Sequence, residues 1–335
     1  MTRYGILGFG HHAVRRLLKG FRESSHSQLT GLWRRDAEKA SANAREYAIP
    51  LVFETPEALC ASPEIDAVFI ASPDALHLPH VLMAAAAGKP ILCEKPLGMN
   101  ANEVALMLSA AHEAGVPFGV AQNFRYNPSV ERMHQWIAEG RIGRPRLAHA
   151  QFAYAADHSP RQWIYDPALA CGGPIGDVGV HCIDALRYLL SDEVTSVTTL
   201  AHGDTASGHV ESYAAIGLGF ASGAVGTVTV TTRAAYRSLV EVTGENGVIV
   251  CEDGLTVDHP VELVLRQNGS IVESISISNE DAYSRMLDGF SAWIQGRGEY
   301  RAPGVDGLHN QRILDAAYAS WRMGTREEVD PTPAA

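Results

Sequence analysis

Runs of basic residues are missing from this chain of 335 residues, and its formal net charge is −11. Nucleic-acid-binding surfaces are strongly basic, so we expect no nucleic-acid partner. Long apolar runs are missing too. The longest, near residues 81–87, is too short to cross a bilayer, so we expect no membrane segment. No signal-peptide pattern precedes the first apolar strand, which predicts a cytoplasmic protein.

Cysteine is scarce and unpaired in its spacing. The five residues are odd in number and form no C-x-x-C pair, so neither a disulfide framework nor a zinc knuckle is indicated, and we expect no metal. A reducing compartment fits this usage. Apolar residues make up 46% of the chain and charged residues 19%, as in an ordinary globular protein, and the length suggests two domains.

The first third of the chain alternates strand and helix patterns. Apolar strands are predicted at residues 4–7, 28–33, 65–71, 91–93 and 116–120, with helical segments between them. This rhythm is typical of a doubly wound parallel sheet, the α/β architecture that binds dinucleotides. We therefore predict a Rossmann domain over residues 1–122.

The sequence pattern changes after residue 122. Residues 195–277 show period-two alternation interrupted by glycine-containing turns, which predicts a large open, mostly antiparallel sheet. We expect residues 123–335 to form a substrate-binding and oligomerisation domain. Two closing helices, at 282–295 and 307–323, are expected to pack back on the first domain, and the tail from residue 327 is expected to be frayed.

A phosphate-binding loop is predicted between the first strand and the first helix. Gly8, Gly10 and Ala13 form a G-x-G-x-x-A pattern at the position that the dinucleotide fingerprint requires. Gly8 permits the turn, Gly10 lets a pyrophosphate approach the backbone, and the helix N-terminus adds positive charge. We include Phe9, His11 and His12 in this cofactor site, and interpret the histidines as loop residues rather than catalysts.

The end of the second strand bears on the choice of cofactor. NAD sites usually place an acid there for the ribose 2′-hydroxyl, whereas this chain has Arg34 and Arg35. A guanidinium suits a 2′-phosphate, so we favour NADP, with NAD possible. Asp36 lies late for the ribose and is better placed as a helix cap. The alternative is that the two arginines are an ordinary surface pair.

Two further polar runs follow predicted strands of the same sheet. The first contains Ser72, Pro73, Asp74 and His77, and the second is Glu94-Lys95-Pro96. Ligands of open α/β sheets bind at the carboxyl ends of the strands, so both runs are predicted to border the cofactor. A lysine held there can reach a substrate and act as an acid or base. The alternative is a charged turn with no chemical role, and Ser72, Asp74 and His77 could equally cap or pack the next helix.

A second unusual run covers residues 172–184. Asp177 and His181 are four apart, so on an α-helix they share a face, and apolar neighbours indicate that this face is buried. The paired glycines before them would let the backbone pack closely against another element. The alternative is a satisfied core pair, because buried polar side chains need partners in any protein.

Together these runs resemble the family of glucose–fructose oxidoreductases and inositol dehydrogenases. The resemblance covers nearly the whole chain and includes Gly304, Asp306 and Gly307. It implies NAD(P)-dependent oxidation or reduction of sugars, polyols and related compounds, with Lys95 and His181 as the acid/base pair. It further implies that Asp177 binds substrate and orients that pair, that the Lys95–Pro96 peptide is cis, and that the open sheet face forms a homodimer or homotetramer.

Several peripheral roles are predicted with packing as the alternative for each. Asn123 and Arg125 could bind substrate hydroxyls at the domain junction. Trp163 and Tyr165 could line a sugar pocket by stacking, and Trp163 could also contact the cofactor. Tyr283, at the start of a closing helix, could touch the nicotinamide.

Two rival functions remain open at this point. Some proteins that this chain resembles keep NAD bound and use transient oxidation to cleave glycosides, so a glycosidase is one alternative. A non-catalytic NADP-binding regulator is the other. A regulator needs none of Lys95, Asp177 and His181, so their joint presence favours an enzyme.

Overall fold

The computed structural model describes residues 1–156, 159–203 and 210–332. The chain divides into two compact units. Unit 1 joins Met1–Gln122 to Tyr283–Leu308, and unit 2 joins Asn123–Ala282 to the stretch that begins at His309. The late return of the chain to unit 1 adds most of one closing helix, α8 (Ala282–Ile294), and the first turn of another, α9 (Gly304–Met323).

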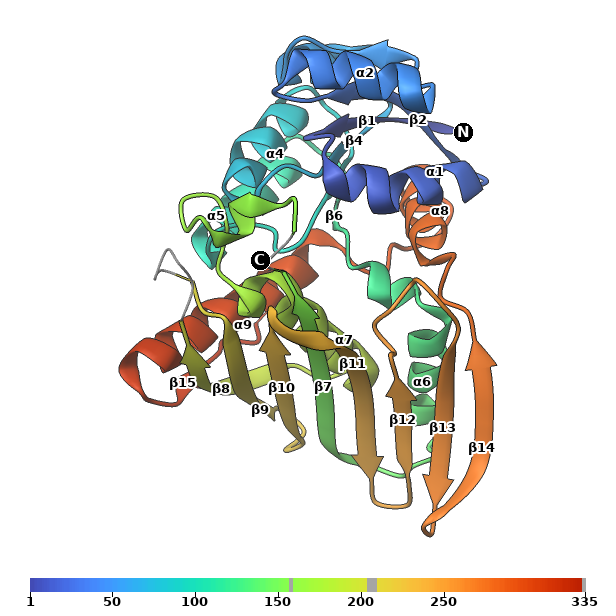
Figure 1. Cartoon of the computed structure of the whole chain (residues 1–335), viewed down its shortest axis with the longest axis vertical. Helices are drawn as coiled ribbons and strands as arrows, with labels where there is room; N and C mark the ends of the chain where they lie inside the picture. Colours follow the sequence, from blue (N-terminus) through green and yellow to red (C-terminus); the bar gives the residue numbers. More distant parts are fainter. Residues whose placement is uncertain (157–158, 204–209, 333–335) are drawn as a thin grey trace. The chain divides into compact units, whose positions relative to one another are not determined.

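Unit 1 contains the predicted parallel sheet (Figure 1). Its six strands lie in the order β3-β2-β1-β4-β5-β6, and every neighbouring pair is parallel. The strands are β1 (Thr2–Leu7), β2 (Ser27–Trp33), β3 (Leu51–Val52), β4 (Ala67–Ile70), β5 (Ile91–Cys93) and β6 (Phe118–Val120). The Rossmann prediction is confirmed. Strand β3 was missed because two residues carry no periodic signal.

Helical segments connect these strands. Asp36 accepts a hydrogen bond from the Lys39 backbone N–H at 3.0 Å, which confirms its predicted capping role. The helical segments are η1 (Ala13–Leu17), α1 (Leu18–Glu23), α2 (Ala37–Tyr47), α3 (Pro56–Ala61), η2 (Asp74–Leu76), α4 (His77–Ala86) and α5 (Ala101–Glu113). The returning helix α8 is tied to unit 1 through Asp288, which accepts the backbone N–H groups of Ser25 and His26, each at 3.0 Å.

Unit 2 is built on a nine-stranded sheet in the order β14-β13-β12-β11-β7-β10-β9-β8-β15. All neighbouring pairs are antiparallel except β7 with β10, which is parallel. The strands are β7 (Pro145–Ala155), β8 (Val194–His202), β9 (Tyr213–Phe220), β10 (Val225–Thr231), β11 (Arg233–Gly244), β12 (Val248–Glu252), β13 (Val261–Gln267), β14 (Ser270–Ile277) and β15 (Glu327–Glu328). The predicted open sheet is confirmed.

The expectation of a frayed tail is wrong for its first residues, Glu327 and Glu328. Glu327 and Glu328 form strand β15, which pairs with Val197 and Ser196 of β8 and so adds an edge strand to the sheet. The Val329 backbone N–H also bonds to the Thr195 carbonyl at 2.9 Å. Residues 333–335 lie outside the described part of the chain.

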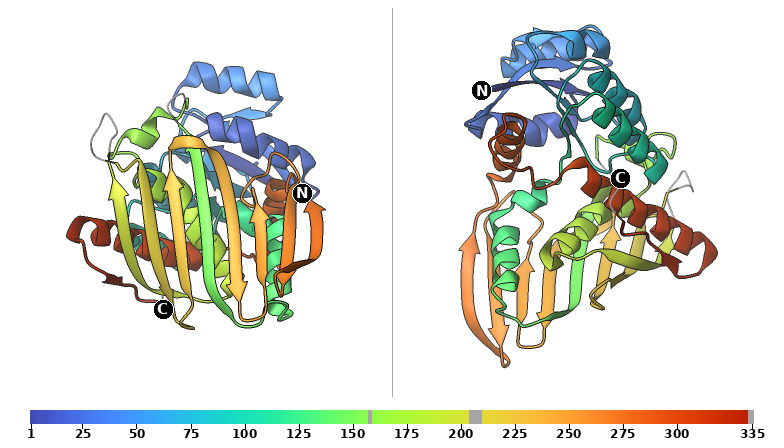
Figure 2. Two further views of the ribbon diagram at one scale, coloured as in Figure 1. Left: turned by 60° about the horizontal axis from the view of Figure 1, so that its bottom comes forward. Right: turned by 180° about the vertical axis from the view of Figure 1, so that it is seen from behind.

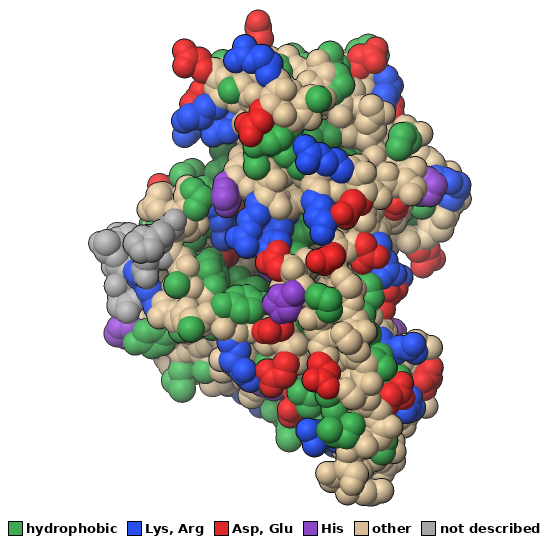
Figure 3. Space-filling model, turned by 45° about the vertical axis from the view of Figure 1, so that its right-hand side comes forward, with side chains coloured by type: hydrophobic (Ala, Val, Ile, Leu, Met, Phe, Trp, Pro, Cys, Tyr) green, Lys and Arg blue, Asp and Glu red, His purple; other side chains and the backbone are tan. Residues whose placement is uncertain are grey.

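Helices cover one face of the unit 2 sheet, and Figure 2 shows the other face without helices over it. The helical segments are η3 (Asn123–Tyr126), α6 (Pro128–Ala138), η4 (Gln162–Tyr165), η5 (Ile175–Gly179), α7 (Val180–Leu190) and most of α9. Leu200, Tyr213 and Val225 are exposed on the sheet strands. Acidic and basic side chains are interspersed on the surface seen in Figure 3. None of the helices in the described ranges has the length and apolar character needed to cross a membrane.

Candidate active site

The turn after β1 has the geometry of a phosphate loop. Gly8 has φ +85°, and a Cβ atom there would lie 2.6 Å from the Ser72 backbone. Only glycine fits this close approach. At Gly10, an added Cβ would meet only the Gly8 carbonyl oxygen, at 3.7 Å, so the space beside the loop is open. The Phe9 side chain is fully buried, so only its backbone can face a ligand.

Beyond β2, the two arginines differ in their surroundings. Arg34 Nη1 donates to Asn43 Oδ1 at 2.9 Å, which holds this half-buried guanidinium against α2. Arg35 is exposed, and the described residues offer its side chain no hydrogen bond or ion pair. Asp36 is used as a cap, so its carboxylate is not free for a ribose. The lowered pKa of Asp36 follows from the N–H groups of Lys39 that it accepts.

His77 connects the loops that follow β4 and β5. Its ring is fully buried, with Nε2 2.9 Å from the Ser72 carbonyl oxygen and Nδ1 3.0 Å from that of Pro96. Both ring nitrogens face backbone carbonyls, so His77 links the two loops, and its predicted contact with the cofactor stays a prediction. Ser72 Oγ lies 3.0 Å from Nδ1 of His80, and burial, followed by the nearby His77, lowers the pKa of His80 to about 4. Asp74 is buried at the start of η2.

The Glu94-Lys95-Pro96 run lies at the carboxyl end of β5, and the Lys95–Pro96 peptide is cis, as the resemblance implied. The Lys95 side chain is partly exposed. The Glu94 carboxylate is mostly buried and lies 2.8 Å from Nε2 of His12 in the phosphate loop. The ring of Tyr283, on α8, has its centroid 6.1 Å from that of His12. The loop, the lysine and Tyr283 therefore gather at one end of the unit 1 sheet.

Unit 1 fits a dinucleotide. The open side of the Gly8–His12 loop, the helix N-terminus behind it and the arginines after β2 supply the amides and charges that phosphates require. Gln122, two residues beyond β6, gives a further indication. Its side-chain amide is buried, and neither its nitrogen nor its oxygen has a hydrogen-bond partner among the residues that the structure describes. Sequence analysis did not single out Gln122, because a lone glutamine carries no spacing signal.

In unit 2, the glycine pair before Asp177 packs as closely as predicted. A Cβ atom at Gly172 would lie 1.7 Å from the Tyr318 hydroxyl, and one at Gly173 would lie 2.0 Å from the Glu211 carbonyl oxygen. The Glu211 side chain accepts the backbone N–H of Gly173 at 3.0 Å and of Ile175 at 2.7 Å. Burial raises its pKa. Glu211 therefore fixes the start of the segment that carries Asp177, a role with no sequence signature.

That segment differs from the α-helix predicted for it. Residues Ile175–Gly179 form a π-helical turn, closed by a bond from the Val180 N–H to the Ile175 carbonyl, before α7 begins. Asp177 therefore lies in the π turn, and His181 lies in the α-helix that follows it. Single π turns are common at functional sites. The His181 ring is mostly buried and packs on Phe124, with ring centroids 4.4 Å apart.

Two residues that sequence analysis missed surround Asp177. Arg161 donates to its two carboxylate oxygens, from Nη1 and Nη2, each at 3.3 Å. The Tyr154 hydroxyl donates to Oδ2. Burial, followed by the charge of Asp177, raises the pKa of Tyr154, so the phenol stays a donor. The Asp177 side chain is mostly buried but keeps 11% of its surface exposed, so part of this carboxylate can still meet a ligand.

The other predicted substrate residues lie in unit 2 with different surroundings. Asn123 is buried, and its Nδ2 has no partner within the described ranges. Tyr165 has a buried hydroxyl that likewise lacks one, while its ring faces the Arg233 guanidinium at 5.8 Å. Trp163 is half-buried on η4. These positions suit polar and stacking contacts, but their predicted roles stay predictions.

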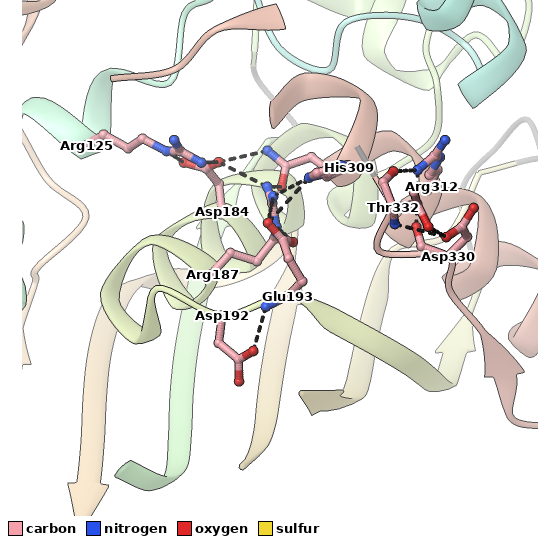
Figure 4. Close-up of polar contacts among 10 residues, drawn as sticks. Arg125, Asp184, Arg187, Asp192, Glu193, His309, Arg312, Asp330 and Thr332 are labelled. Atoms are coloured by element: carbon pink, nitrogen blue, oxygen red, sulfur yellow. Dashed lines mark hydrogen bonds and ion pairs between the residues drawn. The ribbon is translucent and has the colours of Figure 1, made fainter. Parts of the chain in front are cut away.

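Arg125 is engaged inside unit 2 (Figure 4). Its Nε and Nη2 donate to the two oxygens of Asp184 at 2.8 and 2.7 Å, and both side chains are almost fully buried. Asn310 Nδ2 donates to the same carboxylate at 2.8 Å. Arg187 continues the network to Glu193 and His309. The bonds of Arg125 are thus those of a structural anchor, and its predicted contact with substrate stays untested.

Sequence comparison assigns the chain to a class of oxidoreductases and to a family within it. Residues 2–122 match the profile "Oxidoreductase family, NAD-binding Rossmann fold", and residues 130–250 match "GFO/IDH/MocA C-terminal domain". The chain belongs to the GFO/IDH/MocA family of oxidoreductases. The predicted resemblance is confirmed.

Individual relatives extend over the whole chain. It is 31% identical to the 1,5-anhydro-D-fructose reductase of Ensifer adhaerens, covering 98% of this chain and 99% of the relative. It is 29% identical to D-xylose 1-dehydrogenase (NADP(+)) 2 of Haloferax volcanii, with the same two coverages. Among solved structures, the aldose-aldose oxidoreductase of Caulobacter crescentus in complex with glycerol matches with a TM-score of 0.90 at 26% identity, covering 98% of this chain and 99% of the other.

Proposed function

We propose that the protein transfers a hydride between NADP, or NAD, and the carbinol or carbonyl carbon of a sugar or polyol. The observation that carries this proposal is the Asp177 carboxylate, still accessible beside Tyr154 and Arg161, on the segment that leads to His181. Such paired acceptors and donors suit vicinal hydroxyls. The names of the relatives, a reductase and a dehydrogenase of sugars, support the same substrate class.

The proposed chemistry divides between the two units. A bound nicotinamide supplies the hydride acceptor or donor. In the oxidation direction, His181 takes the hydroxyl proton as the hydride leaves, and Lys95 donates a hydrogen bond that stabilises the charge developing on the same oxygen. Asp177 accepts a neighbouring hydroxyl and orients the substrate. In the reduction direction, His181 returns the proton to the new hydroxyl.

The test is nicotinamide absorbance with sugars, polyols and keto-sugars against both cofactors, using wild type and Lys95→Met. The variant should lose roughly 10²–10⁴-fold in turnover, the range of a general acid–base contribution, and should still bind cofactor. Lys19→Met, an exposed lysine on α1, is the matched control and should keep wild-type turnover. Normal turnover in Lys95→Met would remove Lys95 from the mechanism.

The same assay separates the rival functions. Cleavage of a glycoside without net change in nicotinamide absorbance would identify a glycosidase. Binding of the cofactor with no turnover across the screen would identify a regulator. Either result would overturn the proposed reaction while leaving the family assignment intact.

We also propose a preference for NADP. Arg35 is exposed after β2 and Arg34 is held nearby by Asn43, so the pair can receive a 2′-phosphate, and Asp36 is occupied as a cap. Charge-assisted hydrogen bonds are worth about 1.5–3 kcal/mol, so Arg35→Ala should weaken NADPH binding by about tenfold or more and leave NADH binding unchanged. Equal effects on both cofactors would contradict the preference.

The proposed assembly is a homodimer or homotetramer formed through the uncovered face of the unit 2 sheet. Exposed apolar side chains on four neighbouring strands support it: Leu147, Leu200, Tyr213 and Val225. Large apolar patches mark interaction surfaces. Leu200→Glu should lower the mass measured by light scattering, and an unchanged mass would place the interface elsewhere. The five free cysteines, four of them buried, support a cytoplasmic location for this assembly.

A further inference from the structure

A histidine of the phosphate loop is paired with the acid of the Glu94-Lys95-Pro96 run. His12 Nε2 and Glu94 Oε1 lie 2.8 Å apart, with side chains 28% and 11% exposed. His12 is the residue just before η1, where the helix N-terminus meets the loop, and Glu94 directly follows β5. Sequence analysis placed both residues near the cofactor but gave no reason for them to meet.

The Glu94 carboxylate places a negative charge beside the phosphate loop. Burial raises the pKa of Glu94, but the charge and hydrogen bond of His12, and then Lys95, outweigh it, so the pKa is lowered overall and the carboxylate is ionised at neutral pH. A buried carboxylate beside a pyrophosphate site repels the ligand, and a carboxylate that loses its partner is costly. A protonated His12 cancels that charge. A neutral His12 can still donate one hydrogen bond, but the negative charge then remains.

Several charged or titratable groups surround His12. On its own segment the charged or titratable neighbours are His11, Arg15 and Arg16. Glu94 and Lys95 face it from the end of β5, and Tyr283 from α8. Arginine, lysine and tyrosine keep their charge state between about pH 5 and 8, whereas histidine changes its own there. His11 is exposed, whereas His12 is the histidine that lies 2.8 Å from Glu94.

We propose that His12 is a proton-linked positioning residue for the cofactor: the dinucleotide binds best when His12 is protonated and paired with Glu94. Binding then takes up a proton, and the affinity falls as the pH rises. For a single linked proton, the dissociation constant rises by at most about tenfold per pH unit. This inference rests on the dinucleotide site of the proposed function and on none of its acid/base assignments.

The experiment measures cofactor binding without turnover. The dissociation constant of NADH is followed by fluorescence from about pH 5 to 8, the range in which histidine titrates, and calorimetry in two buffers of different ionisation enthalpy counts the protons taken up. NADH is the first probe because it carries no 2′-phosphate that titrates in this range. NADPH is the second. Wild type should lose affinity as the pH rises and take up a fraction of a proton.

Two variants distinguish linkage from packing. His12→Gln keeps a side-chain N–H for Glu94 but carries no charge. It should bind NADH more weakly than wild type at low pH, match it at high pH and take up no proton. Glu94→Gln removes the negative charge and should bind NADH more tightly than wild type at high pH. His26→Gln, an exposed histidine after α1, is the matched control and should keep the wild-type profile.

The outcomes separate this inference from the proposed function. Affinity that does not vary with pH in wild type, with no proton uptake, would overturn the linkage and leave the oxidoreductase assignment standing. If both variants bound NADH more weakly by the same factor at every pH, the His12–Glu94 pair would contribute packing alone. That result would also overturn the proposed linkage. A folded protein that binds neither NADH nor NADPH at any pH would remove the cofactor site itself, and with it both proposals.

Discussion

Two aspartates on one segment of unit 2 have opposite surroundings. Asp177 lies in the π-helical turn η5, and Asp184 lies seven residues later in α7. Each meets an arginine. Asp184 is buried at 2% exposure and accepts bonds of 2.7 and 2.8 Å from Arg125, whereas Asp177 keeps 11% of its side-chain surface exposed and its bonds from Arg161 are 3.3 Å long. The same residue type thus supports the fold at one position and remains accessible at the other.

The cause lies in the elements around each carboxylate. Asp184 lies on the regular helix α7, which packs on β7 and β10, and Asn310 of α9 donates a further hydrogen bond to its Oδ1. Asp177 lies where Glu211 and the glycine pair hold an irregular turn, and its partner Arg161 comes from a loop and is itself 24% exposed. Buried ion pairs with short bonds are costly to break, whereas partly exposed ones can exchange partners with a ligand.

The largest effect is predicted for Asp184→Asn. Removing one charge leaves the Arg125 guanidinium buried and unpaired, which should lower the free energy of unfolding by about 3–5 kcal/mol, measured by urea denaturation. Asp253→Asn is the matched control, because the Asp253 side chain is 40% exposed and its ion pair with His259, at 3.4 Å, lies at the surface. The control should change stability by less than about 0.5 kcal/mol. A loss below about 1 kcal/mol for Asp184→Asn would show that the two aspartates do not differ as described.

A smaller effect is predicted for Asp177→Asn, and it should appear in turnover rather than in stability. Arg161 keeps contact with solvent when the charge is removed, so the free energy of unfolding should fall by no more than about 1 kcal/mol. Turnover should fall by roughly 10²-fold, since a positioned hydrogen-bond acceptor is lost from the proposed site. Steady-state kinetics and urea denaturation on the same sample test both parts. Instability equal to that of Asp184→Asn, with normal turnover in the folded fraction, would reverse the assignment.

The sequence alone could not separate these two residues. Both are aspartates among apolar neighbours, and the partner Arg125 lies 59 positions from Asp184, so no local spacing links them. The helical interpretation placed Asp177 and His181 on one face, but the π turn is produced by tertiary contacts, with Glu211 and Tyr318 filling the space that the glycines leave. Arg161, Tyr154 and Glu211 were missed for the same reason.

Unit 1 was more predictable because its signals are local. Gly8 reflects a turn whose backbone conformation and close approach to Ser72 demand glycine, and the strand–helix rhythm is periodic over many residues. The charge partners within unit 1 were not predictable. His12 and Glu94 are 82 positions apart in the sequence, and His77 contacts Pro96, which lies 19 positions away. Periodicity and turn chemistry could therefore predict the scaffold and the loop, whereas the contacts that position the side chains depend on the folded chain.

A further prediction concerns the arginine that covers the accessible aspartate. Arg161→Gln should raise the KM for substrate by about tenfold, equivalent to about 1.4 kcal/mol, because Asp177 loses the donor that orients it. It should change the free energy of unfolding by less than about 0.5 kcal/mol, as expected for a partly exposed ion pair. Arg161→Lys, which keeps the charge but not the paired donors, should lie between wild type and Gln. An unchanged KM in Arg161→Gln would show that the Arg161–Asp177 ion pair is a surface contact with no role in substrate binding.

The smallest effect is predicted at the rim of the buried cluster, where Glu193 meets Arg187 and His309. Burial raises the pKa of Glu193, but hydrogen bonds from His309 and Arg187 outweigh it and lower the pKa to about 2. A carboxyl whose pKa is lowered in the folded state stabilises the protein above its ordinary pKa of about 4.3. That stability is lost as the pH falls from there toward about 2.

This dependence should be visible in a pair of matched variants. Because 35% of the Glu193 side chain is exposed, solvent screening should keep its contribution below about 1 kcal/mol. Glu193→Gln should reduce the difference in urea stability between about pH 7 and pH 3, a window on either side of the ordinary carboxyl pKa. Glu280→Gln, an exposed residue, should leave that difference unchanged. If Glu193→Gln also leaves the difference in urea stability unchanged, the rim of the cluster is solvated like the surroundings of Asp177. In that case only the Arg125–Asp184 centre of the cluster is structural.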